Sequence, residues 1–310
     1  ISPISSKGQI AGKLPWKIEL AVKWKVVGIT VEGAGKDHMS KGGSHDLASQ
    51  ICKRIINYPV PYPLSYEWFL IGGKKMSTSK GVGSTASEML DILPPELIRF
   101  LMVKTKIEQQ INFDPSEKNT VPNLFDDYQK AADAYFEKTN DDLARSFELS
   151  QIPPRLSSKR TPSLRSSVPK IRFLVLAQWV QMPNMEEEIK KEGLGPWVKY
   201  AKNWIEKYAP ESEKFTIQKE LPKEAESLSK EQKELLGKIA SELDRKWTGE
   251  QFQTRIYDIG KELGLNGKET FAAVYLCLLG KDHGPKAAWL ILSLDKEFVK
   301  KRFEEVSKYD

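Results

Sequence analysis

The sequence is organised around one basic stretch with glycines at both ends, Gly72-Gly73-Lys74-Lys75-Met76-Ser77-Thr78-Ser79-Lys80-Gly81. The run before it, Glu67–Ile71, is apolar and aromatic enough to predict a short strand. After it, Thr85 and Glu88 have the spacing of a capping box that opens a helix. Glycines allow close approach to a ligand, and lysine ammonium groups suit phosphate oxygens. The stretch is therefore predicted to be a mobile strand-to-helix loop, either a solvated basic turn or a polyphosphate-binding element.

Composition indicates an ordinary globular protein. The 310 residues are 40% hydrophobic and 29% charged, which is enough for two or three domains, and the formal charge of +6 favours a polyanionic partner. The two cysteines, Cys52 and Cys277, have neither zinc-site nor disulfide spacing, so we expect a reducing compartment. With no long apolar run and no signal-peptide pattern, the expected location is the cytoplasm. The initial Ile1 suggests a trimmed chain.

A second polar glycine-rich segment follows a predicted strand. Residues 11–20 are expected to be extended, and residues 26–32 are β-branched and predict a buried strand. Gly35–His38 and Gly42-Gly43-Ser44 come next, and then a helix over residues 47–57 with Ser44 as its N-cap. Strand, loop and helix form half of a parallel α/β unit, whose ligands bind at the carboxyl ends of the strands. A helix N-terminus after two glycines is also suited to an anion.

Asp37 and His38 have two interpretations. They either hydrogen-bond locally in a turn, or Asp37 accepts a hydrogen bond from a ribose while His38 lines a substrate pocket. The same tetrapeptide recurs as Gly280–His283, where Gly280 follows a helical run and is predicted to be a helix C-cap. The tetrapeptide is therefore weak evidence by itself, and the strand before Gly35 is what favours a site.

The rest of the chain is predicted to be mainly helical. Residues 58–64 contain three prolines and are expected to be an extended connector. Pro95 is expected to begin a helix, residues 111–115 to form a turn, and Asn123 to cap an amphipathic helix. Residues 149–169 are rich in proline and serine and predict a linker. The helices expected beyond it are 171–192, 196–208, 229–246, 249–263, 267–279, 285–294 and 295–308.

Taken together, these motifs resemble the class I lysyl-tRNA synthetases in order and spacing. Lys75–Ser79 is similar to the KMSKS signature of class I synthetases, with Thr78 in place of the second lysine. The stretch Phe271–Arg302 is similar to the last helices of the family. The other matching motifs are Gly12–Trp16, Gly35–His38 with Gly42–Ser44, Tyr66–Trp68, Leu93–Glu96 with Arg99-Phe100, and Phe113–Pro115.

The resemblance implies an α/β plus all-α protein. Residues 1–84 would be the C-terminal half of a Rossmann catalytic domain with the signature-like loop, and residues 85–148 a helical stem-contact domain. Residues 149–169 would be a linker, and residues 170–310 an α-helix cage that binds the anticodon. The implied partners are lysine, ATP with Mg²⁺, and tRNA(Lys), with no membrane contact. No zinc or other protein-bound metal is predicted in this portion, and a monomer is expected.

The resemblance also implies the reaction and its residues. Lysine would attack the α-phosphate of ATP, and the adenylate would then react with the terminal ribose of the tRNA. Lys75 and Lys80 would neutralise the phosphates, with part of the role of the missing lysine at Thr78 shifted to Lys80. The ATP-binding residues would be Asp37, Gly42, Gly43, Met76, Ser77 and Ser79.

The lysine pocket implied by the resemblance contains Trp16, His38 and Tyr66. An aromatic face near a substrate ammonium gives a cation–π contact worth about 0.5–2 kcal/mol. The alternative for Trp16 is ordinary core packing. For the tRNA, the implied candidates are aromatic and basic residues that would stack bases or bind phosphates, with core packing as the alternative. They are Trp247, Phe252, Arg255 and Tyr257.

One departure from the family concerns ATP binding. No His-x-Gly-His occurs, since the three histidines are His38, His45 and His283. We therefore expect that these 310 residues alone do not form lysyl-adenylate. Two alternatives remain: a tRNA-binding module without catalysis, or a related ligase such as the glutamyl enzyme. The glutamyl enzyme should place a cation against its anionic substrate, and no arginine is evident in the pocket segments.

Overall fold

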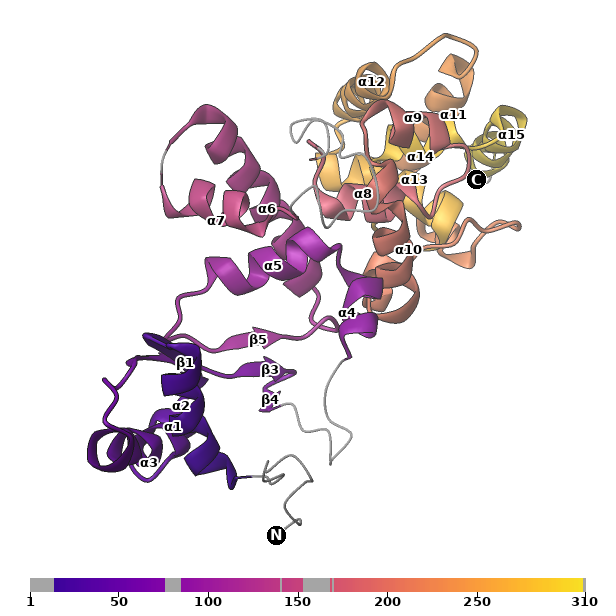
Figure 1. Cartoon of the computed structure of the whole chain (residues 1–310). Coiled ribbons are helices and arrows are strands. Elements are labelled where there is room, and N and C mark those ends of the chain that lie inside the picture. Colours follow the sequence, from indigo (N-terminus) through magenta and orange to yellow (C-terminus); the bar gives the residue numbers. More distant parts are fainter. Residues whose placement is uncertain (1–13, 76–84, 140, 153–167, 169, 309–310) are drawn as a thin grey trace, which may run out of the picture. The chain divides into compact units, whose positions relative to one another are not determined.

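The computed structural model describes residues 14–75, 85–139, 141–152, 168 and 170–308. Met76, Ser77, Ser79 and Lys80 of the predicted site lie outside the described residues. The chain divides into two compact units, each described by itself below (Figure 1). Unit 1 contains residues 1–84 and 101–113, and unit 2 contains residues 85–100 and 114–310. The three-domain division expected from the sequence stays a prediction.

Unit 1 begins with a helix where the sequence predicted extended chain. Helix α1 (Trp16–Val27) follows Pro15 and ends at Gly28, which has φ +77°. The prediction was wrong because Gly12 and Pro15 suggested breaks, whereas Pro15 lies just before the helix, a position that proline tolerates. Leu20, Ala21 and Trp24 lie on one helical face, and burial of this face stabilises α1 against the preference of its valines for strands.

A pair of parallel strands follows α1. Strand β1 (Val31–Gly35) pairs with β2 (Tyr62–Tyr66), so that Gly35 lies opposite Tyr66. The predicted strand over residues 26–32 therefore begins later than expected, because its first residues complete α1. The connection consists of α2 (Lys36–Met39), α3 (Ser44–Ile51) and a π-helix (Cys52–Ile56). Helix α1 packs against α3 and the π-helix, and their shared core is Leu20, Ala21, Trp24, Ala48 and Cys52.

A second small sheet carries the hairpin that leads into the signature-like stretch. Strand β3 (Phe69–Ile71) pairs antiparallel with β4 (Lys74–Lys75) and parallel with β5 (Ile111–Phe113) (Figure 1). Gly72 and Gly73 form the two-residue turn, with φ +54° and +72°, which fits a hairpin turn that requires positive φ at both positions. The predicted turn over residues 111–115 is thus partly a strand.

Three predicted helix starts in the first part of unit 2 can be compared directly with the structure. Thr85 forms the predicted capping box with Glu88 at the start of α4 (Ala86–Ile92), and Pro95 begins α5 (Pro95–Lys104), the last residues of which belong to unit 1. Asn123 was wrongly predicted as a cap: α6 (Thr120–Glu137) starts one turn earlier, after Asn119.

The middle of unit 2 has an aromatic core. Helix α6 packs against α7 (Asp142–Ser150) and α8 (Phe173–Trp179). The ring of Phe125 stacks on Phe173 at 4.2 Å between centroids, and Trp197 meets Phe125 edge-on at 4.7 Å. Aromatic pairs of this geometry add about 0.5–1.5 kcal/mol each beyond the area that they bury.

The C-terminal helices agree closely with the sequence prediction, apart from the segment 171–192, which forms two helices. They are α9 (Glu186–Lys191), α10 (Val198–Lys207), α11 (Lys230–Glu242), α12 (Gly249–Glu262), α13 (Gly267–Leu279), α14 (Ala287–Ser293) and α15 (Lys296–Ser307). Capping boxes at Ser229, Thr248 and Asn266 start α11, α12 and α13, and Gly280 ends α13 with φ +66°. Such local signals are what made these boundaries predictable.

Each compact unit contains one buried cysteine. Cys52 lies in unit 1 and Cys277 in unit 2. Burial raises the pKa of the Cys52 thiol, and it raises that of Cys277 to about 12. Within the part of the chain that the structure describes, none of the helices combines the length and apolar character needed to cross a membrane.

Candidate functional site

The candidate site lies where β1 and β2 end in unit 1. Helix α2 starts directly after Gly35, and it packs against both strands. A methyl group built on Gly35 would lie 3.7 Å from the Tyr66 ring, so the two strand ends meet closely. Asp37 and His38 are exposed on this single helical turn. The structure thus brings together Asp37, His38 and Tyr66 at the carboxyl edge of parallel strands. The sequence predicted this edge for Asp37 and His38 but not strand β2, because the prolines of residues 58–64 indicated an extended connector.

The two glycines after α2 are required by the local backbone. Gly42 has φ +77°, which disfavours a side chain. A Cβ on Gly43 would lie 2.5 Å from the carbonyl oxygen of His38 and 2.8 Å from that of Asp37. This tight turn holds α2 against the start of α3, where His38 Nδ1 lies 3.3 Å from the hydroxyl of Ser44.

The start of α3 already has an anionic partner within the chain. The carboxylate of Asp46 accepts a hydrogen bond of 2.9 Å from the Gly42 N–H. Ser44 was predicted as the N-cap, but it is the first helical residue, and Gly43 precedes it. Because Asp46 occupies the position of an anion, this turn is better suited to a neutral nucleoside than to a phosphate.

Lys75 is held beside Asp37 by two contacts. Its Nζ lies 3.3 Å from Asp37 Oδ2 and 3.3 Å from the centroid of the Trp68 ring. Both charged side chains are more than half exposed, so the ion pair contributes at most about 1 kcal/mol. An exposed cation–π contact contributes a similar amount, about 0.5–1 kcal/mol. The lysine is therefore oriented, yet its ion pair is weak enough to be exchanged for a ligand.

A second ion pair links α2 to the segment between β2 and β3, and here α2 contributes the cation. Lys36 Nζ lies 2.7 Å from Glu67 Oε2, and Gln110 donates a hydrogen bond to Glu67 at 3.4 Å. The hydrogen bond from Lys36 is the main cause of a lowered pKa for Glu67. Because Lys36 and Asp37 are adjacent, the two ion pairs together tie α2 to the segment before β3 and to β4.

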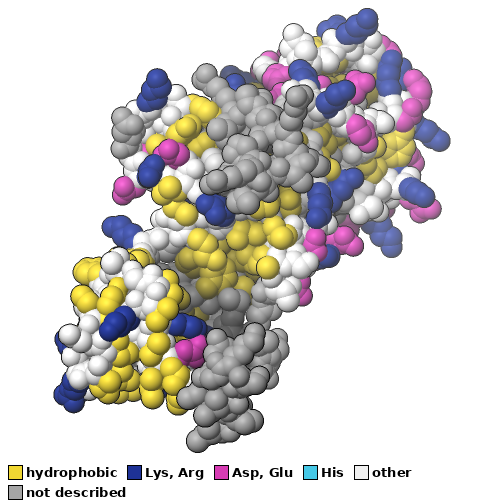
Figure 2. Space-filling model, in the orientation of Figure 1, with side chains coloured by type: hydrophobic (Ala, Val, Ile, Leu, Met, Phe, Trp, Pro, Cys, Tyr) yellow, Lys and Arg dark blue, Asp and Glu magenta, His cyan; other side chains and the backbone are white. Residues whose placement is uncertain are grey.

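Trp16 occupies the first position of α1 and is 55% exposed. Its described ring contact is with Lys23, whose Nζ lies 5.8 Å from the ring centroid. The structure therefore does not place Trp16 in contact with the groups around Asp37. Its exposure disfavours the alternative of core packing, which is instead the role of Trp24 in the same helix. More generally, exposed apolar side chains are frequent on the described surface of unit 1 (Figure 2).

The tRNA candidates in unit 2 differ in accessibility. Phe252 is fully buried in α12, with Trp247 stacked on it at 5.3 Å, so its ring packs in the core and has no surface for a base. Arg255 donates to Glu242 at 2.7 Å and to Glu262 at 3.0 Å. These bonds raise the pKa of Arg255, and the Arg255 hydrogen bond lowers that of Glu242. Tyr257, which is 47% exposed, has the most accessible ring of the three aromatic candidates.

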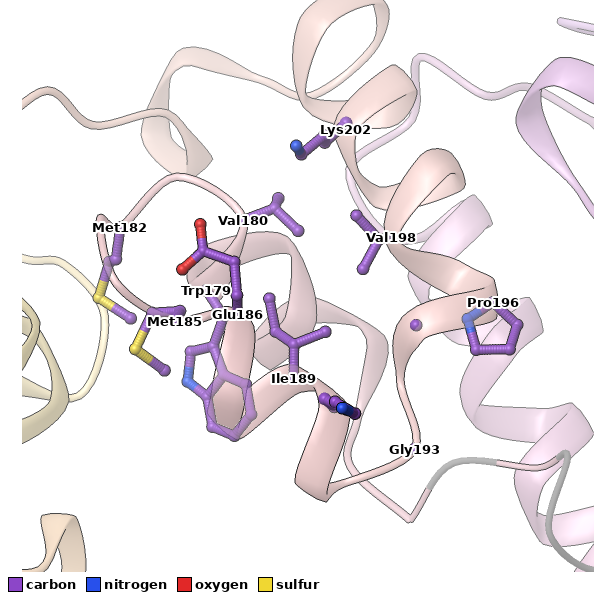
Figure 3. Close-up of a pocket in the computed structure, with 12 residues that line it drawn as sticks. Trp179, Val180, Met182, Met185, Glu186, Ile189, Gly193, Pro196, Val198 and Lys202 are labelled. Atoms are coloured by element: carbon purple, nitrogen blue, oxygen red, sulfur yellow. The ribbon is translucent and has the colours of Figure 1, made fainter.

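An apolar pocket of about 390 Å³ lies among α8, α9 and the start of α10 in unit 2 (Figure 3). Trp179, Met185, Ile189 and Val198 line it, with Lys202 among its polar groups. It contains none of the predicted site residues. Within the described residues, no cluster of three His, Cys, Asp or Glu side chains could hold a metal ion.

Comparison with known families divides the chain in the same order as the motifs. Residues 4–153 match the family described as "tRNA synthetases class I (K)". Residues 201–307 match the family described as "Anticodon binding domain". A class I synthetase domain is therefore followed by an anticodon-binding domain.

Curated relatives extend the similarity to almost the whole chain. The lysine–tRNA ligase of Methanosarcina barkeri is 33% identical over 327 residues, covering 96% of this chain and 60% of its own length. Those of Methanosphaera stadtmanae and Archaeoglobus fulgidus are 34% and 33% identical, with 94% of this chain covered in each case. The chain therefore combines a class I tRNA synthetase domain with an anticodon-binding domain and is similar to lysine–tRNA ligases over almost its whole length. It spans about 60% of the length of the curated relatives it matches.

Among solved structures, a glutamate tRNA ligase from Elizabethkingia meningosepticum aligns with a TM-score of 0.47 at 12% identity. The alignment covers 95% of this chain and 60% of that chain.

The residues that sequence reasoning missed are Trp68, Lys36 and Glu67. The signal for Trp68 was present, because two glycines between short apolar and basic runs are typical of a two-residue hairpin. A hairpin through Gly72-Gly73 brings the residues that flank β3 and β4 close together. The prediction of a single loop over residues 72–81 missed the pairing of β3 with β4.

Proposed function

We propose that this chain is the part of a lysine–tRNA ligase that contributes one half of the ATP and lysine site together with the tRNA-binding helices. The observation that carries the proposal is the cluster of Lys75, Asp37 and His38 at the carboxyl edge of the parallel strands. The order of the two matched families and the similarity to lysine–tRNA ligases over 96% of the chain support it.

In the proposed reaction, the lysine carboxylate attacks the α-phosphate of ATP and pyrophosphate leaves. A hydroxyl of the terminal ribose of tRNA(Lys) then attacks the carbonyl carbon of the lysyl-adenylate, so that the lysyl ester forms and AMP leaves. Mg²⁺ would accompany the nucleotide and share the charge of the phosphates. Lys75, with Lys80 of the same stretch, would stabilise negative charge that develops on the phosphates. Met76, Ser77 and Ser79 would complete the contacts of this stretch with ATP.

The remaining groups are assigned by their chemistry. The Asp37 carboxylate suits a ribose hydroxyl, and the turn at Gly42-Gly43 allows a nucleoside to approach the backbone. His38 and Tyr66 lie at the same strand ends and would line the lysine pocket with Trp16. An exposed indole such as that of Trp16 is available for a substrate ammonium. We place the reaction in the cytoplasm and expect a monomer.

The tRNA is proposed to bind through unit 2, with Tyr257 as a stacking residue and Arg255 and Trp247 as supports of its helix. Stacking on one base is worth about 1–3 kcal/mol. Filter binding over a salt series tests this, with tRNA bearing a UUU anticodon against tRNA with an unrelated anticodon. A preference that persists at moderate salt would support lysine specificity. Equal binding that disappears with salt indicates phosphate attraction alone.

Helix α12 offers a matched pair of variants for the same assay. Tyr257→Ala should weaken binding of the UUU tRNA about 5- to 100-fold without lowering the thermal midpoint substantially. Phe252→Ala removes a fully buried ring and should cost about 3–5 kcal/mol of stability. Should Tyr257→Ala leave binding unchanged, the stacking role fails while the ligase assignment stands.

Catalysis by these 310 residues alone is a separate question. Because no His-x-Gly-His motif is present in the sequence, we expect no lysine-dependent exchange of pyrophosphate into ATP. Exchange above background with the purified chain would contradict this expectation. Selective tRNA binding without exchange is the combined result expected, and glutamate-dependent exchange would favour the related glutamyl activity.

A further inference from the structure

The hairpin before the signature-like stretch holds one lysine in a defined place. Trp68 precedes β3, and Lys75 is the last residue of β4. The Lys75 ammonium lies 3.3 Å from the centroid of the Trp68 ring, and 3.3 Å from the Asp37 carboxylate. An ammonium this close to the face of an indole is in the geometry of a cation–π contact. Lys75 thus has an aromatic support and a separate counter-ion.

The backbone on either side of the hairpin turn, including that of Trp68, is hydrogen-bonded to β5 of unit 1. The carbonyl oxygen of Trp68 accepts a hydrogen bond from the Ile111 N–H at 3.0 Å. At the other end of the hairpin, the Gly73 N–H donates to the Asn112 side chain at 2.8 Å. Both ends of the hairpin are thereby anchored on β5. The indole has a fixed attachment, whereas the ammonium reaches it on a flexible stem.

The counter-ion is more easily replaced. Asp37 is 60% exposed at its side chain, and its ion pair with Lys75 is open to solvent. A polyphosphate brings several negative charges and competes directly with one carboxylate, but it does not compete for the apolar ring face. An arriving polyphosphate therefore replaces the contact of Lys75 with Asp37 and leaves its contact with the Trp68 ring in place.

We propose that Trp68 is a positioning residue for Lys75: its ring holds the ammonium at the end of the hairpin, and Asp37 is the counter-ion that a polyphosphate replaces. This proposal rests on the proposed function, in which Lys75 meets the phosphates of ATP. It adds a residue that acts on the phosphates through Lys75. It also gives Asp37 a second role, as the partner of Lys75 before the nucleotide binds.

The neighbouring Lys74 provides an internal control. Lys74 and Lys75 are adjacent and both exposed, but successive side chains of a strand point to opposite faces. The experiment measures the rates at which an amine-acetylating reagent modifies the two lysines in the 310-residue chain, by mass spectrometry of the peptide that contains both. The ratio of the Lys75 rate to the Lys74 rate cancels differences in reagent and in overall stability.

Variants of Trp68 compare removal of its aromatic ring with replacement by another aromatic ring. Trp68→Leu should raise the Lys75/Lys74 ratio about two- to five-fold, because one side of the ammonium is uncovered. Trp68→Phe and Trp68→Tyr should restore most of the protection, since each keeps an aromatic face. An unchanged ratio in Trp68→Leu, or equal increases in the Leu and Phe variants, would overturn the positioning role.

Inorganic triphosphate tests the exchange of the counter-ion. It should slow modification of Lys75 but not of Lys74, and in Asp37→Asn the same slowing should need about two- to five-fold less triphosphate because the competing carboxylate is absent. The same triphosphate requirement in both proteins, or no slowing in either, would overturn the exchange. The tRNA assay is independent of these rates, so failure of the ligase assignment and failure of this proposal give different results.

Discussion

The tetrapeptide Gly-Lys-Asp-His occurs twice in this chain, and the two copies use the same side chains differently. In the first copy, Gly35 is the last residue of strand β1, in an extended conformation at φ −60°, and Lys36–His38 begin the helical turn α2. Gly280–His283 ends helix α13, with Gly280 in the left-handed region at φ +66°. Identical sequence is therefore placed at the start of one helix and at the end of another.

The first copy directs its charges at side chains on other elements. Lys36 pairs with Glu67 at 2.7 Å, and Asp37 pairs with Lys75 at 3.3 Å. Charged groups paired in this way at the surface can exchange partners at little cost. A ligand that carries charge or hydroxyl groups can therefore compete for them.

The second copy binds backbone and its own neighbour. Lys281 Nζ donates to the carbonyl oxygens of Glu211 and Lys214 at 3.0 and 2.7 Å. His283 lies 2.6 Å from Asp282 and 3.2 Å from the Ser212 carbonyl oxygen. These contacts fasten a loop to the end of α13. The comparison teaches that surroundings, more than the four residues themselves, decide between a binding role and a structural role.

The largest difference between the copies is expected in the loss of stability when the glycine of each copy is replaced by alanine. Gly280→Ala should destabilise unit 2 by about 2 kcal/mol, because it forces a side chain into the left-handed region and to 3.3 Å from Pro222. Gly35→Ala should change the stability by less than about 0.5 kcal/mol, since φ is ordinary and Tyr66 lies at van der Waals distance. Calorimetry of both variants measures this, and equal losses would break the comparison.

A smaller difference is expected at the lysines. Lys281→Met should cost about 1–1.5 kcal/mol, because two backbone carbonyls lose a charged donor. Lys36→Met removes a surface ion pair and should cost at most about 1 kcal/mol. Urea unfolding of each variant against the parent chain tests the order. A Lys36→Met loss that exceeds the Lys281→Met loss would show that the first copy also has a mainly structural role.

The smallest expected effect is a pH dependence of the stability that the Lys36–Glu67 pair of the first copy contributes. The hydrogen bond from Lys36 lowers the pKa of Glu67, so the pair stabilises the fold above the unfolded-state pKa of this carboxyl. The stabilisation is lost as the pH falls through the lower, folded-state pKa. The stability difference between the parent chain and Lys36→Met should therefore be present at neutral pH and disappear in acid, once the pH has fallen below the folded-state pKa of Glu67. A difference that persists in acid would mean that Lys36 acts through its aliphatic stem.

Much of the helical architecture could be predicted because its signals are local. The pairs Thr85–Glu88 and Ser229–Gln232 form capping boxes from residues three apart, and Gly280 ends its helix through its own backbone freedom. Helix α1 could not be predicted in this way. It is stabilised by burial against α3, and no local pattern distinguishes its final valines from the beginning of a strand.

The candidate site was predictable to the extent that it depends on strand ends. The order of strand, glycine loop and helix placed Asp37 and His38 correctly at the carboxyl edge. The contact between Trp68 and Lys75 depends on a turn with positive φ at Gly72 and Gly73, and the pairing of Asp37 with Lys75 joins residues 38 positions apart. Contacts of this kind follow from tertiary geometry and are not encoded in spacing along the chain.

The distribution of the two cysteines has an experimental consequence. Each compact unit holds a single buried thiol, Cys52 in one and Cys277 in the other. A buried thiol reacts with a disulfide reagent only when its surroundings open, so the two reaction rates report two separate opening equilibria in one sample. The native chain therefore contains two intrinsic probes of local opening, Cys52 for the unit that carries Lys75 and Cys277 for the helical unit.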